Sequence, residues 1–222
     1  MKKTVVVKLG GAVAAEATGF VTRMARDHAV CVVHGAGPQI SAEMKRIGLD
    51  VAFVGGRRVT TEAGLAVVRA SFAAVNAELC AALGPLAVPL FGDEIGLQAT
   101  PVPELGLVGE ALPSRPAAVA HALAAGLIPV VAPLAEGPLN VNADEAAAAL
   151  ALGLGADRIL FLTDVPGLLL GGAVAATIRG VEVERMLDAG ELTGGIVPKL
   201  RAAVGAARGG VDAQIGETAV LA

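Results

Sequence analysis

The 222-residue chain contains no tryptophan and no tyrosine, and five phenylalanines bring its aromatic share to only 2%. Without aromatic side chains to stack on bases, and with a formal net charge of −4, the chain lacks the features of a nucleic-acid-binding surface. We therefore expect no nucleic-acid partner. Hydrophobic residues make up 55% of the chain. Because so few of them are aromatic, the core must be built from Ala, Val, Leu and Ile.

Cysteines and long apolar runs are also scarce. Cys31 and Cys80 are too few for a disulfide framework, and we expect both to be reduced and buried. Lys8 interrupts the first apolar run too early for the core of a signal peptide. Other apolar runs are broken by Pro, Gly or charge before about 18 residues. The sequence thus predicts a cytoplasmic protein without a membrane span.

Short β-branched runs alternate with longer Ala- and Leu-rich stretches. The runs are mostly apolar throughout, which is typical of parallel strands covered by helices on both faces. We expect strands at residues 4–8, 29–33, 86–90, 127–132, 158–162 and 211–215. We expect helices at residues 17–27, 38–48, 61–83, 115–125, 143–154, 181–189 and 198–208. The pattern predicts an α/β fold, a three-layer αβα sandwich with an open, mainly parallel sheet.

A soft boundary near residues 133–140 suggests two lobes that share one continuous sheet. Residues 1–137 would form an N-terminal lobe for the amino-acid substrate and for dimerisation. Residues 138–222 would form a C-terminal lobe for the nucleotide.

A lysine and two glycines follow the first expected strand. Lys8 stands at the carboxyl end of this strand, which is the edge where open α/β sheets bind their ligands. Gly10 and Gly11 leave room for backbone N–H groups to approach an anion. The local alternative is a surface lysine before an ordinary turn.

The second strand runs into a similar glycine-rich turn that contains His34, Ala36 and Gly37. Pro38 suits the first position of the next helix, whose N-terminus would offer free N–H groups to an anion. His34 is a candidate general base, although we favour a strand-end residue that hydrogen-bonds the backbone. The spacing of the glycines differs from the dinucleotide-binding fingerprint.

Two later segments place polar side chains beside helix starts. Arg58 follows a glycine pair and would suit bidentate capture of a carboxylate, although an exposed loop charge explains the local sequence equally well. Asn140, Asn142 and Asp144 lie at the start of another helix, where an N-cap accounts for only one polar residue. A buried aspartate at this place would hold lysines in position.

The C-terminal part of the chain repeats this pattern. Residues 163–168 place polar side chains and a turn after a buried strand, and a later glycine pair leads to a helix that carries Lys199 in its first turn. A cation at that position opposes the helix dipole, so we expect Lys199 to have another task, such as contacting phosphate.

Taken in order, these segments resemble the amino-acid kinase superfamily, and within it the acetylglutamate kinases. The similarity extends from Lys8 through Lys199 to residues 216–218, and the order and spacing of the segments are more specific than any one of them. The stretches at residues 56–60, 105–109 and 140–144 resemble the acetylglutamate kinases in particular.

The resemblance implies a reaction and a role for each matching residue. The chain would transfer the γ-phosphate of ATP to the side-chain carboxylate of N-acetyl-L-glutamate in arginine biosynthesis, with Mg²⁺ carried by the phosphates and no protein-bound metal. Lys8 and Lys199 match two lysines that stabilise the transition state, and Asp144 matches the aspartate that orients them. The expected substrate-binding residues are Gly10, Gly11, Ala36, Gly37, Arg58, Asn140 and Asn142. The expected nucleotide-binding residues are Thr163, Asp164, Val165, Gly167, Leu168, Leu192, Thr193 and Gly195.

Elementary chemistry agrees with these roles. The nucleophile is a carboxylate that is already ionised near neutral pH, so the reaction needs no general base. The difficulty is to bring one anion up to another, which positioning and positive charge can overcome.

The chain departs from the family pattern at three places. Ala36 stands where the resemblance expects a glycine, and it would be strained only if the backbone there had a positive φ. The segment after residue 215 is short, so we expect a more open nucleotide lobe. The chain begins at the first strand, without the N-terminal helix of the arginine-inhibited relatives, so we expect a homodimer without arginine feedback.

Alternative functions stay open at this point. A sister kinase for carrier-protein-linked aminoadipate or glutamate shares the phosphate machinery, but few basic residues lie near Arg57 and Arg58 to meet an acidic carrier. Carbamate kinase would leave Arg58 without a substrate carboxylate. A non-catalytic sensor of nucleotides or amino acids could use the same fold, although the presence of both Lys8 and Lys199 argues against it.

Overall fold

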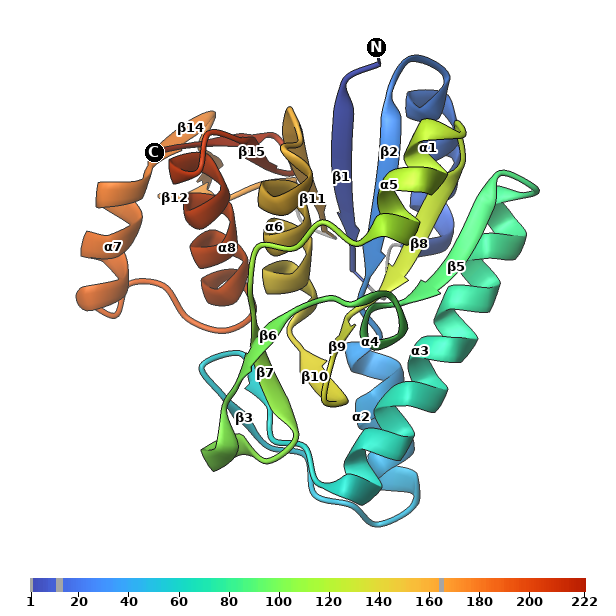
Figure 1. Cartoon of the computed structure of the whole chain (residues 1–222). Helices are drawn as coiled ribbons and strands as arrows, with labels where there is room; N and C mark the ends of the chain where they lie inside the picture. Colours follow the sequence, from blue (N-terminus) through green and yellow to red (C-terminus); the bar gives the residue numbers. More distant parts are fainter. Residues whose placement is uncertain (1, 11–13, 164–165) are drawn as a thin grey trace.

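The computed structural model of the chain describes residues 2–10, 14–163 and 166–222. Its centre is an eight-stranded sheet in the order β14-β16-β15-β11-β1-β2-β8-β5, in which the β15–β16 pair is antiparallel and the other pairs are parallel (Figure 1). The strands are Thr177–Arg179 (β14), Thr218–Leu221 (β16), Asp212–Ile215 (β15), Arg158–Leu162 (β11), Thr4–Leu9 (β1), Ala29–His34 (β2), Ile128–Ala132 (β8) and Ala87–Phe91 (β5).

Helices cover both faces of this sheet, as Figure 1 shows. One layer consists of α1 (Ala14–Asp27), α2 (Gly37–Arg46) and α3 (Glu62–Leu83). The other consists of α5 (Ala117–Ala124), α6 (Ala143–Leu154), α7 (Gly180–Asp188) and α8 (Ile196–Arg208). The strands feed both layers in alternation, because Val5, Val7 and Leu9 pack into the core of the first layer and Val6 into that of the second. The predicted three-layer αβα sandwich is confirmed.

The predicted elements agree with the structure within a few residues at their ends. All six expected strands and all seven expected helices are present. One start was misplaced, because α2 begins at Gly37 and Pro38 is its second residue. The large sheet takes strands from both sides of the expected boundary at residue 137, and the division into two lobes stays a prediction.

The sequence did not predict several short elements, most of which lie beyond the carboxyl ends of β1, β2 and β8, whereas β12 lies near β14 (Figure 1). A separate hairpin consists of β3 (Phe53–Val54) and β4 (Arg57–Arg58). A four-stranded sheet consists of β6 (Ala99–Pro101), β7 (Val108–Ala111), β10 (Leu139–Val141) and β9 (Leu134–Ala135). The others are α4 (Gly92–Ile95), a 3₁₀ turn (Pro103–Leu105) and the ribbon of β12 (Leu169–Leu170) and β13 (Ala173–Val174).

Among the described helices, α3 alone is long and apolar enough to cross a membrane by length and composition, and 39% of its most apolar window is buried. Its buried side chains, such as Phe72 and Leu79, pack into the core of the first layer, which accounts for its apolar character. Both cysteines are free. Cys31 is buried as expected, whereas Cys80 is partly exposed, so the expectation of burial was wrong for Cys80.

Candidate active site

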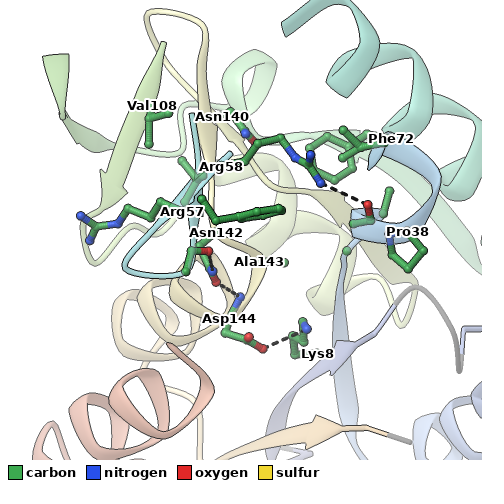
Figure 2. A pocket seen from close by; sticks show the side chains of 17 residues that line it. Lys8, Pro38, Arg57, Arg58, Phe72, Val108, Asn140, Asn142, Ala143 and Asp144 are labelled. Atoms are coloured by element: carbon green, nitrogen blue, oxygen red, sulfur yellow. Dashed lines mark hydrogen bonds and ion pairs between the residues drawn. The ribbon is translucent and has the colours of Figure 1, made fainter. Parts of the chain in front are cut away.

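A cavity of about 260 Å³ opens at the carboxyl ends of β1 and β2. Figure 2 shows Lys8 and Asp144 at one end of it and Arg58 and Phe72 at the other. The cavity therefore has a cationic side chain at each end. The residues that line it are Lys8, Gly35, Ala36, Gly37, Pro38, Ile40, Phe53, Gly56, Arg57, Arg58, Phe72, Val108, Asn140, Val141, Asn142, Ala143 and Asp144.

Three charged side chains from different elements meet at the Lys8 end. Because side chains alternate along β1, Lys8 lies on the same face as Val6, which α6 covers. The Nζ atom of Lys8 lies 2.9 Å from Oδ1 of Asp144 in the first turn of α6, and Nζ of Lys199 in the first turn of α8 lies 3.0 Å from the same oxygen. The three residues are only 6–8% exposed.

The electrostatics of this cluster favour an anion. Burial alone would raise the pKa of Asp144, but the charges of Lys8 and Lys199 outweigh it and hold the pKa below its ordinary value. Burial lowers the pKa of Lys199, and the attraction of Asp144 opposes this effect. Two cations share one carboxylate, so one buried positive charge stays uncompensated within the cluster. Such a charge is costly unless an anionic ligand approaches it.

Asn142 explains why α6 begins beside this cluster. Its Oδ1 accepts hydrogen bonds from the backbone N–H groups of Asp144 (2.8 Å) and Glu145 (3.3 Å), which confirms the N-cap. Its Nδ2 donates to the carbonyl of Gly56 in the turn of the β3–β4 hairpin (2.9 Å). Both ends of this amide are thus engaged within the protein, and the expected substrate contact of Asn142 stays a prediction.

Arg58 occupies the opposite end of the cavity and is only 6% exposed, so the interpretation as an exposed loop charge was wrong. Its guanidinium donates to the carbonyl of Gly37 (3.1 Å) and to Oγ of Ser41 (2.8 Å), and it lies 4.5 Å from the centre of the Phe53 ring. Among the described residues no carboxylate pairs with Arg58, and burial lowers its pKa. A carboxylate on a ligand would supply the missing counter-charge.

Asn140 lies near Arg58, as Figure 2 shows. Its Nδ2 donates to Oγ1 of Thr60 (3.0 Å), and that hydroxyl donates to the carbonyl of Arg58 (2.8 Å). Thr60 is fully buried and was not among the candidate residues. The signal that could have found it was its place in the stretch at residues 56–60.

The glycine-rich turn after β2 accommodates Ala36 without strain. Ala36 caps α2 with φ −143° and ψ 29°, so this position does not need a glycine. Gly37 is the first residue of α2, and its carbonyl accepts the hydrogen bond from Arg58 that is described above. Gly10 follows β1 and is not among the lining residues, and Gly11 lies outside the described residues.

The chain matches the amino acid kinase family over residues 3–217. It belongs to that family. The acetylglutamate kinase of Rubrobacter xylanophilus is 44% identical to this amino acid kinase over 226 residues, which cover 96% of this chain and 88% of the relative. The acetylglutamate kinase of Geobacillus kaustophilus is 38% identical over 222 residues, with 93% and 86% covered. The solved structure of smu.665 from Streptococcus mutans UA159 has a TM-score of 0.87 at 26% identity, with 100% and 99% covered.

His34 of this kinase has a structural place. It is fully buried at the end of β2 and is not among the residues that line the cavity. Nδ2 of Asn76 lies 3.1 Å from Nε2 of His34 and also donates to the carbonyl of Val130 (2.9 Å). Burial lowers the pKa of His34 to about 4. The favoured structural interpretation agrees with this position: the ring has a side-chain partner in Asn76, and a backbone hydrogen bond at Gly35 partly opposes the effect of burial on its pKa.

The expected nucleotide-binding residues follow β11 and precede α8. Leu162 pairs with Leu9 across the sheet, so Thr163 begins its segment beside the Lys8 end of β1. The backbone N–H of Leu168 donates to Oγ1 of Thr218 (2.9 Å). A Cβ atom on Gly167 would lie 2.6 Å from the same oxygen, so close packing accounts for this glycine.

The remaining nucleotide candidates divide into two groups. Leu192 packs against the core, and Thr193 and Gly195 are exposed just before α8, the helix that carries Lys199. Asp164 and Val165 lie outside the described residues. None of the described nucleotide candidates lines the cavity, and the roles of all eight stay predictions.

Proposed function

We propose that this kinase transfers the γ-phosphate of ATP to the side-chain carboxylate of N-acetyl-L-glutamate, in arginine biosynthesis. The observation that carries the proposal is the pair of cationic ends of one cavity. Arg58 is buried without a carboxylate partner among the described residues, and Lys8 and Lys199 share Asp144 at the other end. A substrate with two carboxylates fits this arrangement, and the relatives described above are acetylglutamate kinases.

In this proposal Arg58 binds the α-carboxylate, and Asn140 lies beside the acetylamino group. The side-chain carboxylate then points towards Lys8, where one of its oxygens attacks the γ-phosphorus. A carboxyl-oxygen–phosphorus bond forms, the bond from the γ-phosphorus to the bridging oxygen breaks, and ADP leaves with that electron pair. No proton moves, because the nucleophile is already an anion. Lys8 and Lys199 offset the charge that gathers on the transferred group.

ATP would approach from the side of β11 and the start of α8, which meet the cavity at the lysine cluster. Among the described residues, no group of three or more His, Cys, Asp or Glu side chains could hold a metal ion. The carboxylate of Asp144 is engaged by two lysines. We therefore assign Mg²⁺ to the phosphates of ATP, where it would neutralise part of their charge.

We also propose a cytoplasmic homodimer formed through α3 and the edge strand β5. The outward face of α3 consists mainly of exposed alanines, which would let a second copy approach closely; they are Ala63, Ala66, Ala70, Ala73, Ala74, Ala77, Ala81 and Ala82. Leu86, next to β5, is also exposed. Light scattering should give the mass of two chains, and an Ala70→Arg variant should give one. A wild-type mass of one chain would contradict the dimer.

The proposed reaction is tested by trapping the acyl phosphate with hydroxylamine in the presence of ATP and a panel of acids. N-acetyl-L-glutamate should give the hydroxamate, whereas N-acetyl-L-glutamine, which lacks the nucleophilic carboxylate, should not. If another acid of the panel gives product and N-acetyl-L-glutamate does not, the substrate assignment changes to that acid. ATP binding without turnover of any acid would favour the sensor.

A further inference from the structure

The hairpin that carries Arg58 is weakly held by its own structure. Its two strands have two residues each, and they are joined by Gly55 and Gly56 at φ 58° and 84°. It forms a sheet of its own, and isolated ribbons of this kind are marginally stable. Phe53 and Val54 are 55% and 56% exposed, so apolar burial adds little. Polar contacts to neighbouring elements must therefore fix its position.

Arg57 makes the most extensive of these contacts. Figure 2 shows its side chain pointing away from the cavity, in contrast to that of Arg58. Its Nε lies 2.9 Å from Oε1 of Glu145, and one terminal nitrogen lies 3.1 Å from Oε2 of Glu145 and 3.1 Å from Oε2 of Glu110. The Arg57 and Glu145 side chains are 21% and 20% exposed. A bidentate, largely buried ion pair keeps its geometry better than an ion pair on the surface does.

Each residue of this pair is adjacent in the sequence to a residue at one end of the cavity. Arg57 is the neighbour of Arg58, and Glu145 is the neighbour of Asp144. A rigid link between the outer residues thus fixes the distance between the guanidinium at one end and the lysine cluster at the other. A misplacement of about 1 Å between bound groups can cost a large factor in rate.

The surroundings of the hairpin differ between its outer side and its tip. On its outer side it borders a second cavity of about 520 Å³, lined in part by Val54, Gly55 and Glu145, so no dense packing holds it there. At its tip, a Cβ atom on Gly56 would lie only 2.8 Å from Cγ of Pro198, the neighbour of Lys199. The tip therefore already touches the helix that carries the second lysine.

We propose that Arg57 and Glu145 are positioning residues, whose ion pair holds the β3–β4 hairpin so that Arg58 and the Lys8–Asp144–Lys199 cluster stand one substrate length apart. This inference rests on the proposed function for its kinetic consequence, but its structural part does not. The pair touches neither substrate; it acts through its two neighbours in the chain.

The test compares Arg57→Gln, Glu145→Gln, the double variant and Arg57→Lys in steady-state kinetics. Arg57→Gln should raise the KM for N-acetyl-L-glutamate about tenfold, equivalent to about 1.4 kcal/mol, and change the KM for ATP by less than about twofold. Because the two residues act as one unit, the double variant should be no worse than Arg57→Gln alone. Arg57→Lys should raise this KM less than Arg57→Gln does, since lysine keeps the positive charge but cannot make the bidentate contact.

The matched control is Arg208→Gln, which removes an ion pair of 2.7 Å with Glu184 between α7 and α8, away from the cavity. It should leave both KM values unchanged. Hydrogen exchange of the ligand-free protein gives a readout independent of substrate identity. The amide of Val59, bonded to the carbonyl of Ala52 at the base of the hairpin, should exchange about tenfold faster in Arg57→Gln.

Unchanged exchange at Val59 together with an unchanged KM for N-acetyl-L-glutamate would overturn the inference. So would a parallel rise of both KM values with an equal loss of thermal stability, because that pattern indicates general destabilisation. If the wild type does not phosphorylate N-acetyl-L-glutamate, the proposed function fails, and the exchange experiment still decides whether the pair holds the hairpin.

Discussion

Replacing Arg58 by glutamine tests the substrate-binding end of the cavity. The guanidinium is buried, and its described hydrogen-bond partners are neutral acceptors, the carbonyl of Gly37, the hydroxyl of Ser41 and the sulfur of Met44. In the free protein the charge is therefore desolvated without an anion, and glutamine removes this cost together with the hydrogen bonds of the guanidinium. We expect folding stability to change by no more than about 1 kcal/mol, since the two effects oppose each other.

Binding of the substrate should suffer far more. The variant loses a charge-assisted contact to a carboxylate in a buried place, and such losses cost about 2–4 kcal/mol. The KM for N-acetyl-L-glutamate should therefore rise by roughly 30- to 1,000-fold. The value of kcat should fall less, because the lysine cluster at the opposite end of the cavity is untouched. Hydroxamate formation gives both constants, and thermal unfolding gives the stability.

A substrate analogue sharpens this experiment. N-acetyl-γ-aminobutyrate has the reacting carboxylate but no α-carboxylate, so the wild type should use it as poorly as Arg58→Gln uses N-acetyl-L-glutamate. The variant should discriminate little between the two acids. Arg46→Gln, a change at an exposed arginine of α2, is the control and should leave the kinetics unchanged. An Arg58→Gln enzyme that keeps its fold and a KM within about threefold of wild type would refute the role of Arg58.

Three further predictions concern the lysine cluster and the turn after Leu105, beside Thr60. Lys199→Met should lower kcat by about 10²–10³-fold, while calorimetry shows that ATP still binds. In the wild type, kcat should fall as the pH rises, and this fall should begin below the ordinary lysine pKa, because burial lowers the pKa of Lys199. Asp144 has a depressed pKa in the folded state, so the stability that its carboxylate adds to the fold is present above about pH 4 and is lost as the pH falls through the folded pKa. Asp144→Asn should therefore flatten the decline of Tm with falling pH in that range. Gly106→Ala would place a Cβ atom 2.3 Å from the carbonyl oxygen of Thr60 at φ 83°, and it should cost about 2–4 kcal/mol of stability in denaturant unfolding.

The sequence was sufficient for the central layers of the fold. Continuous apolar runs predicted the six strands of the sheet core, and the polar residues around Asn142 marked a helix start that the structure has. It failed for the short strands around the cavity, such as β3 and β4. Two-residue strands carry no periodic signal, and their pairing depends on contacts that only the folded chain makes.

The candidate site was predictable where chemistry belongs to a strand end or a helix start, as for Lys8 and Asp144. It was not predictable where a residue acts through a distant partner. Thr60 supports Asn140 from 80 residues away, and Arg57 meets Glu145 from 88 residues away. The local sequence gives each of these residues an ordinary role, because the partner that matters is brought close only by the sheet topology.

The most direct measurement of the central claim is a crystal structure with N-acetyl-L-glutamate, Mg²⁺-ADP and aluminium fluoride, which imitates the phosphoryl group during transfer. The account predicts the fluoride centre between the side-chain carboxylate and ADP, with the Nζ atoms of both Lys8 and Lys199 about 2.7–3.2 Å from its fluorides. A complex in which either lysine contacts only Asp144, or in which the two ammonium groups face different ligands, would contradict it.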